Sequence, residues 1–355
     1  MRVASLVVRG FRNLVDAALD IPDDGLVLLG DNGHGKTNLL EALAYPVLFR
    51  SLRGARDRDV ARFGGPGFHV GLTRNDGTTI ATTWEAVSSR KRVTVASEER
   101  PRITDALGAW LAVAFLPTDL GLVQEGAAER RRWIDRMLSL GDTSYLEALL
   151  RYRAAVAQRN AALRRGDQRT AAAFDDGLAR AGAVVVRGRM LWLENAESAW
   201  RAELVRLGEP LEVTLRYKGD ATLSDATAWP ERLAASRDRD LQRGQTHVGP
   251  HRDDLLLGLA GRQLREFGST GQQRTAAIGL RLLEHQTLAE RRNTRPALLV
   301  DDVFAELDAS RQDHLAVRLK ETGAQLVVTA PRAADVPDRL EAARWHVNDG
   351  VITQE

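Results

Sequence analysis

Apolar residues with the spacing of β-strands gather near both ends of the chain. At the N-terminal end, the pattern predicts strands over residues 2–8, 15–21 and 26–29 and shorter strands over 67–97. At the C-terminal end, it predicts buried strands over 296–302 and 325–329, a helix over 309–321 and a hairpin over 345–352. The two ends together therefore predict an α/β unit.

The central part of the chain has a helical pattern. From about residue 125 to residue 207 it is rich in Ala, Arg, Leu and Glu and has no strand signal. Glycines at Gly166-Asp167 and Gly182 predict breaks, which favour a kinked bundle over a long coiled coil. We therefore predict an α/β unit made of residues 1–120 and 241–355, with a mostly helical insertion over 121–240.

The strand over 26–29 leads into a glycine-rich loop and then into a helix. The loop and helix start read Gly30-Asp31-Asn32-Gly33-His34-Gly35-Lys36-Thr37-Asn38. Glycines let successive backbone N–H groups turn towards an anion, and the helix directs its positive N-terminal end at the same place. Lysine and threonine at the end of such a loop contact the β- and γ-phosphates and a Mg²⁺ ion. This stretch predicts a nucleotide site.

The predicted strand over 296–302 ends in two acids, Asp301 and Asp302. The carboxyl ends of strands in open α/β sheets face the ligand crevice. Asp301 is therefore predicted to organise, directly or from the second shell, the Mg²⁺ held by Thr37, and Asp302 to orient an attacking water. Lys36, Asp301 and Asp302 are the predicted catalytic residues.

Three further stretches are rich in charged or metal-binding side chains, and each has more than one interpretation. The run from Gln245 to Asp254 contains two histidines, an arginine and two aspartates, and we favour a hydrogen-bonded turn over a metal site because the paired spacing of zinc ligands is missing. The segment from Arg50 to Arg62 accumulates arginines and is either a solvated surface or a strip that faces DNA or phosphate. Residues Arg130, Arg131 and Arg132 are candidate DNA contacts, with a solvated helix face as the alternative.

Composition narrows the class of protein. The 50 basic and 48 acidic residues leave a net charge of +2, so the chain is no polycation. The absence of cysteine excludes disulfides, thiolate metal sites and cysteine nucleophiles. No apolar run approaches the length of a membrane span and the N-terminus lacks the pattern of a signal peptide, so we expect a cytoplasmic protein with no membrane partner.

Three motifs in this order resemble the ATP-binding-cassette (ABC) type of ATPase: the glycine-rich loop, the run Ser269-Thr270-Gly271-Gln272-Gln273-Arg274, and Leu298–Asp302 followed by Ala305-Glu306-Leu307-Asp308. Within that class the chain resembles the RecF family. That resemblance rests on residues 10–13, 32–42, 50–53, 129–132 and 246–254, and it departs at His34 and Thr118. Read without the resemblance, Ser269 or Thr270 is simply a good N-cap for a helix that runs to about Arg291.

The resemblance implies an ABC/SMC-type P-loop ATPase head with an inserted helical second lobe. It implies that Ser269, Gly271 and Gln272 of one subunit cover the γ-phosphate held by another, so that ATP and Mg²⁺ bind within a homodimer and act as a switch. It further implies binding to gapped DNA and to junctions of single- and double-stranded DNA, and RecO and RecR as partners in loading recombinase.

Two rivals share parts of this pattern. The ATPase subunit of a membrane transporter has all three nucleotide motifs, but the run from Gly249 to Asp254, the arginine-rich helices and the lack of a histidine after the strand ending at Thr329 count against it. A nuclease of the overcoming-lysogenization type carries a further acidic catalytic domain at its C-terminus, and we expect no such domain in this chain.

Overall fold

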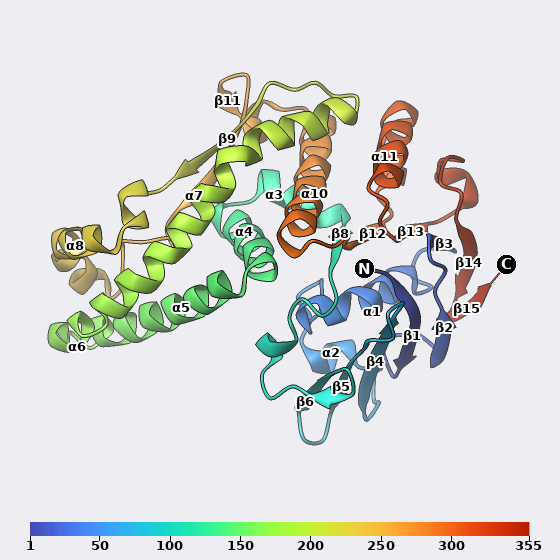
Figure 1. Cartoon of the computed structure of the whole chain (residues 1–355), viewed down its shortest axis with the longest axis horizontal. Coiled ribbons are helices and arrows are strands. Elements are labelled where there is room, and N and C mark those ends of the chain that lie inside the picture. The colour runs from blue at the N-terminus through green and yellow to red at the C-terminus, as the bar shows by residue number, and fades with distance from the viewer. Residues whose placement is uncertain (355) are drawn as a thin grey trace. The chain divides into compact units, whose positions relative to one another are not determined.

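The structure is a computed structural model, and it describes residues 1–354. The chain divides into two compact units (Figure 1). Unit 1 comprises Met1–Asp119, Arg206–Gly208 and the residues from Glu284 onwards, and unit 2 comprises Leu120–Val205 and Glu209–Leu283. Both ends of the chain thus build unit 1. The domain boundaries suggested by the sequence, at residues 120 and 240, stay predictions.

Unit 1 is the α/β unit. Its strands are β1 (Val3–Arg9), β2 (Ala17–Asp20), β3 (Gly25–Leu29), β4 (Gly67–Arg74), β5 (Thr79–Glu85), β6 (Arg90–Val95), β7 (Glu98–Glu99), β8 (Ala112–Phe115), β12 (Ala297–Asp301), β13 (Leu326–Ala330), β14 (Ala343–Asn348) and β15 (Val351–Gln354). Its helices are α1 (Lys36–Leu48), α2 (Asp57–Val60) and α11 (Ala309–Glu321). The strands form one sheet in the order β2-β1-β4-β5-β6-β7 and another in the order β15-β14-β3-β13-β12-β8.

The second of these sheets is parallel from β14 to β8, and only β15 runs antiparallel at its edge. All residues of β3, β12 and β13 are buried, as expected for parallel strands that are covered on both faces. Helix α1 contacts strands of both sheets. Its residues are buried on almost every side, which explains why its apolar positions lack a clear helical stripe.

Unit 2 is mostly helical. Its helices are α3 (Gly121–Gln124), α4 (Ala127–Gly141), α5 (Thr143–Arg164), α6 (Gln168–Ala172), α7 (Asp175–Arg206), α8 (Trp229–Arg243) and α9 (Leu264–Phe267), and α10 (Thr270–Arg292) begins in it. Strands β9 (Val213–Lys218), β10 (Asp254–Leu259) and β11 (Arg262–Gln263) form a small antiparallel sheet. Within residues 1–354, no helix combines the length and the apolar composition needed to cross a bilayer.

The glycines of the helical region have two different roles. The predicted break at Gly166-Asp167 is confirmed, because α5 ends before it and Asp167 caps α6. The predicted break at Gly182 is wrong, because α7 runs through it without interruption for 32 residues. A Cβ atom at Gly182 would collide with the indole ring of Trp229, so glycine is needed there for close packing rather than for a kink.

Candidate functional site

The predicted phosphate loop and the two acids meet at one edge of the parallel sheet. Strand β13 lies between β3 and β12, and the register places Thr329 beside Leu28 on one side and Asp301 on the other. The loop that follows β3 therefore lies at the same edge as the carboxyl ends of β12 and β13. This edge is the candidate nucleotide site.

The loop has the backbone shape that its glycines predict. Gly30, Gly33 and Gly35 have φ values of 143°, 87° and 117°, which residues with a Cβ rarely adopt. Helix α1 starts at Lys36, so the N–H groups of its first turn lack partners within the helix and are available to an anion.

Lys36 lies inside the loop and is only 3% exposed. Its Nζ donates hydrogen bonds to the carbonyl oxygens of Gly30 at 2.7 Å and Asp31 at 3.2 Å. These two bonds hold the ammonium group against the backbone of the loop. A phosphate that enters the loop meets a positive charge already in place.

Thr37 and Asp301 come together although they are far apart in the sequence. The Thr37 hydroxyl donates to Asp301 Oδ1 at 2.9 Å, and the Thr329 hydroxyl contacts the same oxygen at 2.8 Å. The predicted proximity of Thr37 and Asp301 is therefore confirmed. Hydroxyl and carboxylate oxygens are the ligands that Mg²⁺ prefers, so this pair fits a magnesium ion.

The environment of Asp301 favours its neutral form. Burial raises the pKa of the Asp301 carboxyl, and the nearby charge of Asp302 adds to the shift, while the hydrogen bonds from Thr329 and Thr37 oppose it. A cation placed beside Asp301 would offset this burial cost. The ionised carboxylate of Asp301 is therefore more stable when a metal ion is bound beside it than when the site holds no cation.

Asp302 adopts an unusual backbone conformation for a residue other than glycine, with a φ of 51°. Its N–H donates to the Thr329 hydroxyl at 3.0 Å, and its Oδ1 lies 3.2 Å from the same hydroxyl. Thr329 thus fixes both acids. The sequence predicts the strand that ends at Thr329 but gives this threonine no role, because a threonine within a buried strand is usually a packing residue.

A buried carboxylate, Glu41, supports the helix behind the loop. It is 1% exposed and accepts hydrogen bonds from Arg12 Nε at 3.0 Å, Arg53 Nε at 3.2 Å and the Ser51 hydroxyl. Burial alone would raise the pKa of Glu41, but these hydrogen bonds from Arg12, Arg53 and Ser51 lower it below its ordinary value. At least one arginine of the predicted basic segment, Arg53, is therefore engaged inside unit 1.

The run Ser269–Arg274 lies in unit 2, at the start of α10. The Ser269 hydroxyl accepts the Gln272 N–H at 3.2 Å, and the Gln272 side chain accepts the Ser269 N–H at 3.0 Å. This reciprocal pair is a capping box, so Ser269, one of the two predicted N-caps, is the one used. Ser269 itself is exposed, whereas Gln273 is buried and donates to the carbonyls of Arg265 and Gly268 at 2.9 Å each.

The run from Gln245 to Asp254 forms a hydrogen-bonded turn. His251 contacts the Tyr152 hydroxyl at 2.5 Å with Nδ1 and the Thr246 carbonyl at 2.9 Å with Nε2. Burial lowers the pKa of His251 to about 4, so the ring is neutral at physiological pH. The turn thus uses its polar side chains inside unit 2, as the favoured interpretation predicts.

The structure corrects the assignment of Arg130 to DNA. Arg130 is 7% exposed, and its Nε and Nη2 donate to the Asp254 carboxylate at 2.8 and 2.9 Å. Arg131 is half-buried and donates to the Asp253 carbonyl at 2.5 Å. Only Arg132 is exposed, and it pairs with Glu129. A run of arginines suggests an exposed surface, but here the Asp254 carboxylate binds Arg130 and the Asp253 backbone carbonyl binds Arg131 inside unit 2.

Removing Arg130 is expected to destabilise unit 2 strongly. Arg130→Met leaves the Asp254 carboxylate partly buried without its partner, which costs about 3 kcal/mol of unfolding free energy. Arg132→Met is the matched control, because its side chain is 67% exposed and its loss should cost less than about 1 kcal/mol. Urea unfolding followed by tryptophan fluorescence measures both. Equal losses in the two variants would contradict the assigned role of Arg130.

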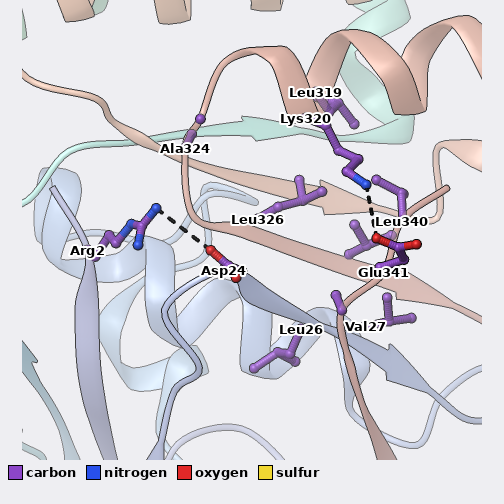
Figure 2. Close-up of a pocket in the computed structure, with 13 residues that line it drawn as sticks. Arg2, Asp24, Leu26, Val27, Leu319, Lys320, Ala324, Leu326, Leu340 and Glu341 are labelled. Carbon is purple, nitrogen blue, oxygen red and sulfur yellow. Dashed lines mark ion pairs between the residues drawn. The ribbon is translucent and has the colours of Figure 1, made fainter.

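A separate cavity of about 310 Å³ lies in unit 1, near the first residues of β3 and β13 and the end of α11 (Figure 2). Leu26, Leu319 and Leu326 are part of its apolar wall. The ion pairs Arg2–Asp24 and Lys320–Glu341 lie among its lining residues. None of the predicted nucleotide-site residues lines it, so it is distinct from the candidate nucleotide site.

Comparison with solved structures shows the class of fold to which this chain belongs. A structure described as the recombination mediator protein RecF-ATP in the RecFOR pathway superimposes with a TM-score of 0.90 at 29% identity, over 100% of this chain and 97% of that one. The Smc head domain of Pyrococcus furiosus superimposes with a TM-score of 0.58 at 14% identity, over 99% of this chain and 95% of that one, which is a likeness of fold alone. With its loop and its parallel sheet, the chain has the fold of an ABC/SMC-type ATPase head.

Sequence relatives narrow the class to one family. The DNA replication and repair protein RecF of Herpetosiphon aurantiacus is 33% identical over an alignment that covers 99% of both chains. RecF of Myxococcus xanthus is 35% identical, over 93% of this chain and 90% of that protein. No protein-family model matches the chain. The chain belongs to the RecF family of DNA replication and repair proteins, and this membership replaces the transporter and nuclease alternatives.

Proposed function

We propose that this chain is an ATP-dependent DNA-binding protein of recombinational repair and replication-fork maintenance. It binds gapped DNA and junctions of single- and double-stranded DNA, dimerises with ATP, and acts with RecO and RecR to help load recombinase. The observation that carries the proposal is the meeting of Thr37 with Asp301 beside the glycine loop, in a chain related over its whole length to RecF proteins.

Each residue of the loop has a different role in nucleotide binding. The N–H groups from Gly30 to Asn38 surround the phosphates, with Asp31, Asn32 and His34 shaping the turn between the glycines. Lys36 exchanges its contacts with loop carbonyls for contacts with phosphate oxygens. Thr37 and Asp301 would hold Mg²⁺, which when bound neutralises charge on the phosphates.

The second acid completes the hydrolytic site. Asp302 accepts a hydrogen bond from water and orients it towards the γ-phosphate, in a position fixed by Thr329. Hydrolysis is used as a switch rather than for a chemical product, so a slow, DNA-stimulated turnover is sufficient.

The capping box supplies the contact between subunits. Ser269, Gly271 and Gln272 lie at an exposed or half-exposed helix start, where N–H groups and a hydroxyl can approach the γ-phosphate held by a second copy of the chain. ATP then favours the dimer because it contacts both copies, and hydrolysis removes the shared phosphate. The membrane plays no part in this cycle.

Replacing Asp301 by Asn is expected to stabilise the nucleotide-free fold while abolishing Mg²⁺-dependent turnover. The amide oxygen still accepts from Thr37 and Thr329, but the charge is gone. Because the folded-state pKa of Asp301 is raised, its ionised form destabilises the fold above both pKa values, and this penalty disappears as the pH falls below its ordinary pKa. The melting temperature should therefore rise at neutral pH, by an amount that shrinks towards about pH 4.

Asp308→Asn is the matched control for this measurement. The N–H of Arg311 donates to Asp308 and lowers the pKa of that carboxyl, so its neutralisation should not raise the melting temperature. A melting temperature of Asp301→Asn below that of the wild type at neutral pH would contradict the inferred cost of the Asp301 charge.

DNA binding tests the proposed function directly. Affinity for gapped duplex and for blunt duplex is measured with and without ATP over a series of salt concentrations. We expect tighter binding to the gapped DNA, a further gain with ATP, a steep fall with salt from the release of counterions, and little dependence on base sequence. Equal binding to both DNAs with no effect of ATP would exclude the proposed function.

A further inference from the structure

The turn between β14 and β15 lies against the phosphate loop. Strand β14 pairs with β3 up to the level of His346 and Leu29, and the chain then continues beside the loop that follows β3. The Gly350 N–H donates to the carbonyl of His34 at 2.9 Å. A Cβ atom on Gly30, at the start of the loop, would collide with the carbonyl of Val347. The hairpin thus lies beside the loop at Gly30 and at His34.

His34 makes a second bond to the same turn through its side chain. The Asp349 N–H donates to His34 Nδ1 at 3.0 Å, and the Asp349 Oδ1 atom lies 3.5 Å from the same ring nitrogen. The backbone and the side chain of one loop residue are therefore both bonded to consecutive residues of the hairpin turn.

A third segment, residues 13–15, bonds to both the turn and the phosphate loop. The Val15 N–H donates to the carbonyl of Gly350 at 2.8 Å. Asn13 Nδ2 donates to the carbonyl of Gly33 at 3.3 Å, and Asn13 Oδ1 accepts from Asn38 Nδ2 at 2.6 Å. Gly350 has a φ of 79°, and a Cβ atom there would collide with the carbonyl of Asn13. Glycine is required at this position because three segments converge on it.

We propose that the β14–β15 turn is a positioning element for nucleotide binding, with His34, Asp349 and Gly350 holding the phosphate loop in its receptive shape. This inference rests on the proposed function of the loop. A loop that is already ordered pays less conformational entropy when a phosphate binds, so bonds made in the free protein appear as affinity for the nucleotide. None of these bonds involves the atoms that contact phosphate or metal.

Two pairs of variants test the proposal. His34→Leu removes the acceptor, whereas His34→Asn restores it, because Asn Oδ1 lies as many bonds from Cβ as His Nδ1 does. Gly350→Ala pushes the turn away from Asn13, whereas Gly77→Ala introduces an alanine at a similar φ of 81° where nothing lies within 4 Å. Each pair thus separates loss of the contact from the general cost of the substitution.

The readout is the dissociation constant of a fluorescent, non-hydrolysable ATP analogue with Mg²⁺, together with turnover by Gly350→Ala at saturating ATP. We expect affinity to fall about five- to tenfold in His34→Leu, the loss that one hydrogen bond brings, and to recover in His34→Asn. Gly350→Ala displaces the turn and should lower affinity by a similar factor. Gly77→Ala should bind as the wild type does. At saturating ATP, Gly350→Ala should turn over ATP as fast as Gly77→Ala. The reason is that none of the bonds of the turn described above involves the catalytic groups Lys36, Asp301 and Asp302.

The outcomes distinguish this inference from the proposed function. If the wild type binds the analogue and both His34→Leu and Gly350→Ala bind it as tightly as Gly77→Ala, the turn has no positioning role, and the nucleotide site stands without it. If the wild type itself does not bind the analogue, the proposed function fails and this inference fails with it.

Discussion

Lys36→Arg is expected to lower ATP turnover at saturating MgATP by about a hundredfold or more, which corresponds to roughly 2.7 kcal/mol of lost transition-state stabilisation. Lys36 is almost completely buried, and its Nζ lies 2.7 Å from the carbonyl of Gly30. The planar guanidinium group is larger than the ammonium group and cannot occupy the same point between the loop and the phosphates. Binding of ATP is expected to weaken less than hydrolysis, because the backbone N–H groups remain.

Lys320→Arg is the matched control for this variant. Its side chain is 50% exposed and pairs with Glu341, away from the loop, so turnover should stay at the wild-type value. A steady-state assay with both variants at saturating MgATP measures the difference. Wild-type turnover in Lys36→Arg would remove Lys36 from the catalytic site.

Ser269→Arg is expected to leave the monomer folded and able to bind ATP, yet to reduce hydrolysis to the level of Lys36→Arg. The loss of the capping box costs about 1 kcal/mol, which the fold tolerates. In a dimer that shares its nucleotides, however, the large cation would lie where Ser269 meets the γ-phosphate held by the second copy. The effect on turnover is therefore far greater than the effect on stability.

The control for Ser269→Arg is Ser269→Ala, which loses the same cap without adding bulk or charge. Binding of a fluorescent ATP analogue, melting temperature and turnover are measured for both. Nearly equal melting temperatures with turnover lost mainly in the arginine variant support the trans contact. If turnover in Ser269→Arg is close to that in Ser269→Ala, Ser269 is only a helix cap.

The elements that the sequence predicts well are those with local causes. The loop from Gly30 to Thr37 and the strand that ends at Asp301 carry their own patterns, and parallel pairing brings them together by a general rule. The cap at Ser269 is equally local, because a serine and a glutamine three residues later exchange side-chain to backbone hydrogen bonds.

The features that the sequence could not predict depend on distant partners. Arg130 resembles a surface residue until Asp254, more than a hundred residues away, is placed beside it. Gly182 resembles a helix breaker in the sequence, but a glycine is needed there because the ring of Trp229 leaves no room for a Cβ atom. The hairpin over 345–352 is predicted from the sequence, yet nothing local indicates that its turn lies against His34. Long-range packing overrides local propensity in each case.

Sedimentation velocity of the wild-type chain with Mg²⁺, with and without a non-hydrolysable ATP analogue, tests most directly the claim that ATP at the phosphate loop joins two copies. Because a ligand shifts an equilibrium only by its preference for one state, the analogue should convert the monomer to a dimer in the wild type and not in Ser269→Arg. A wild-type chain that binds the analogue and sediments unchanged, or a Ser269→Arg variant that dimerises as the wild type does, would contradict the shared nucleotide site.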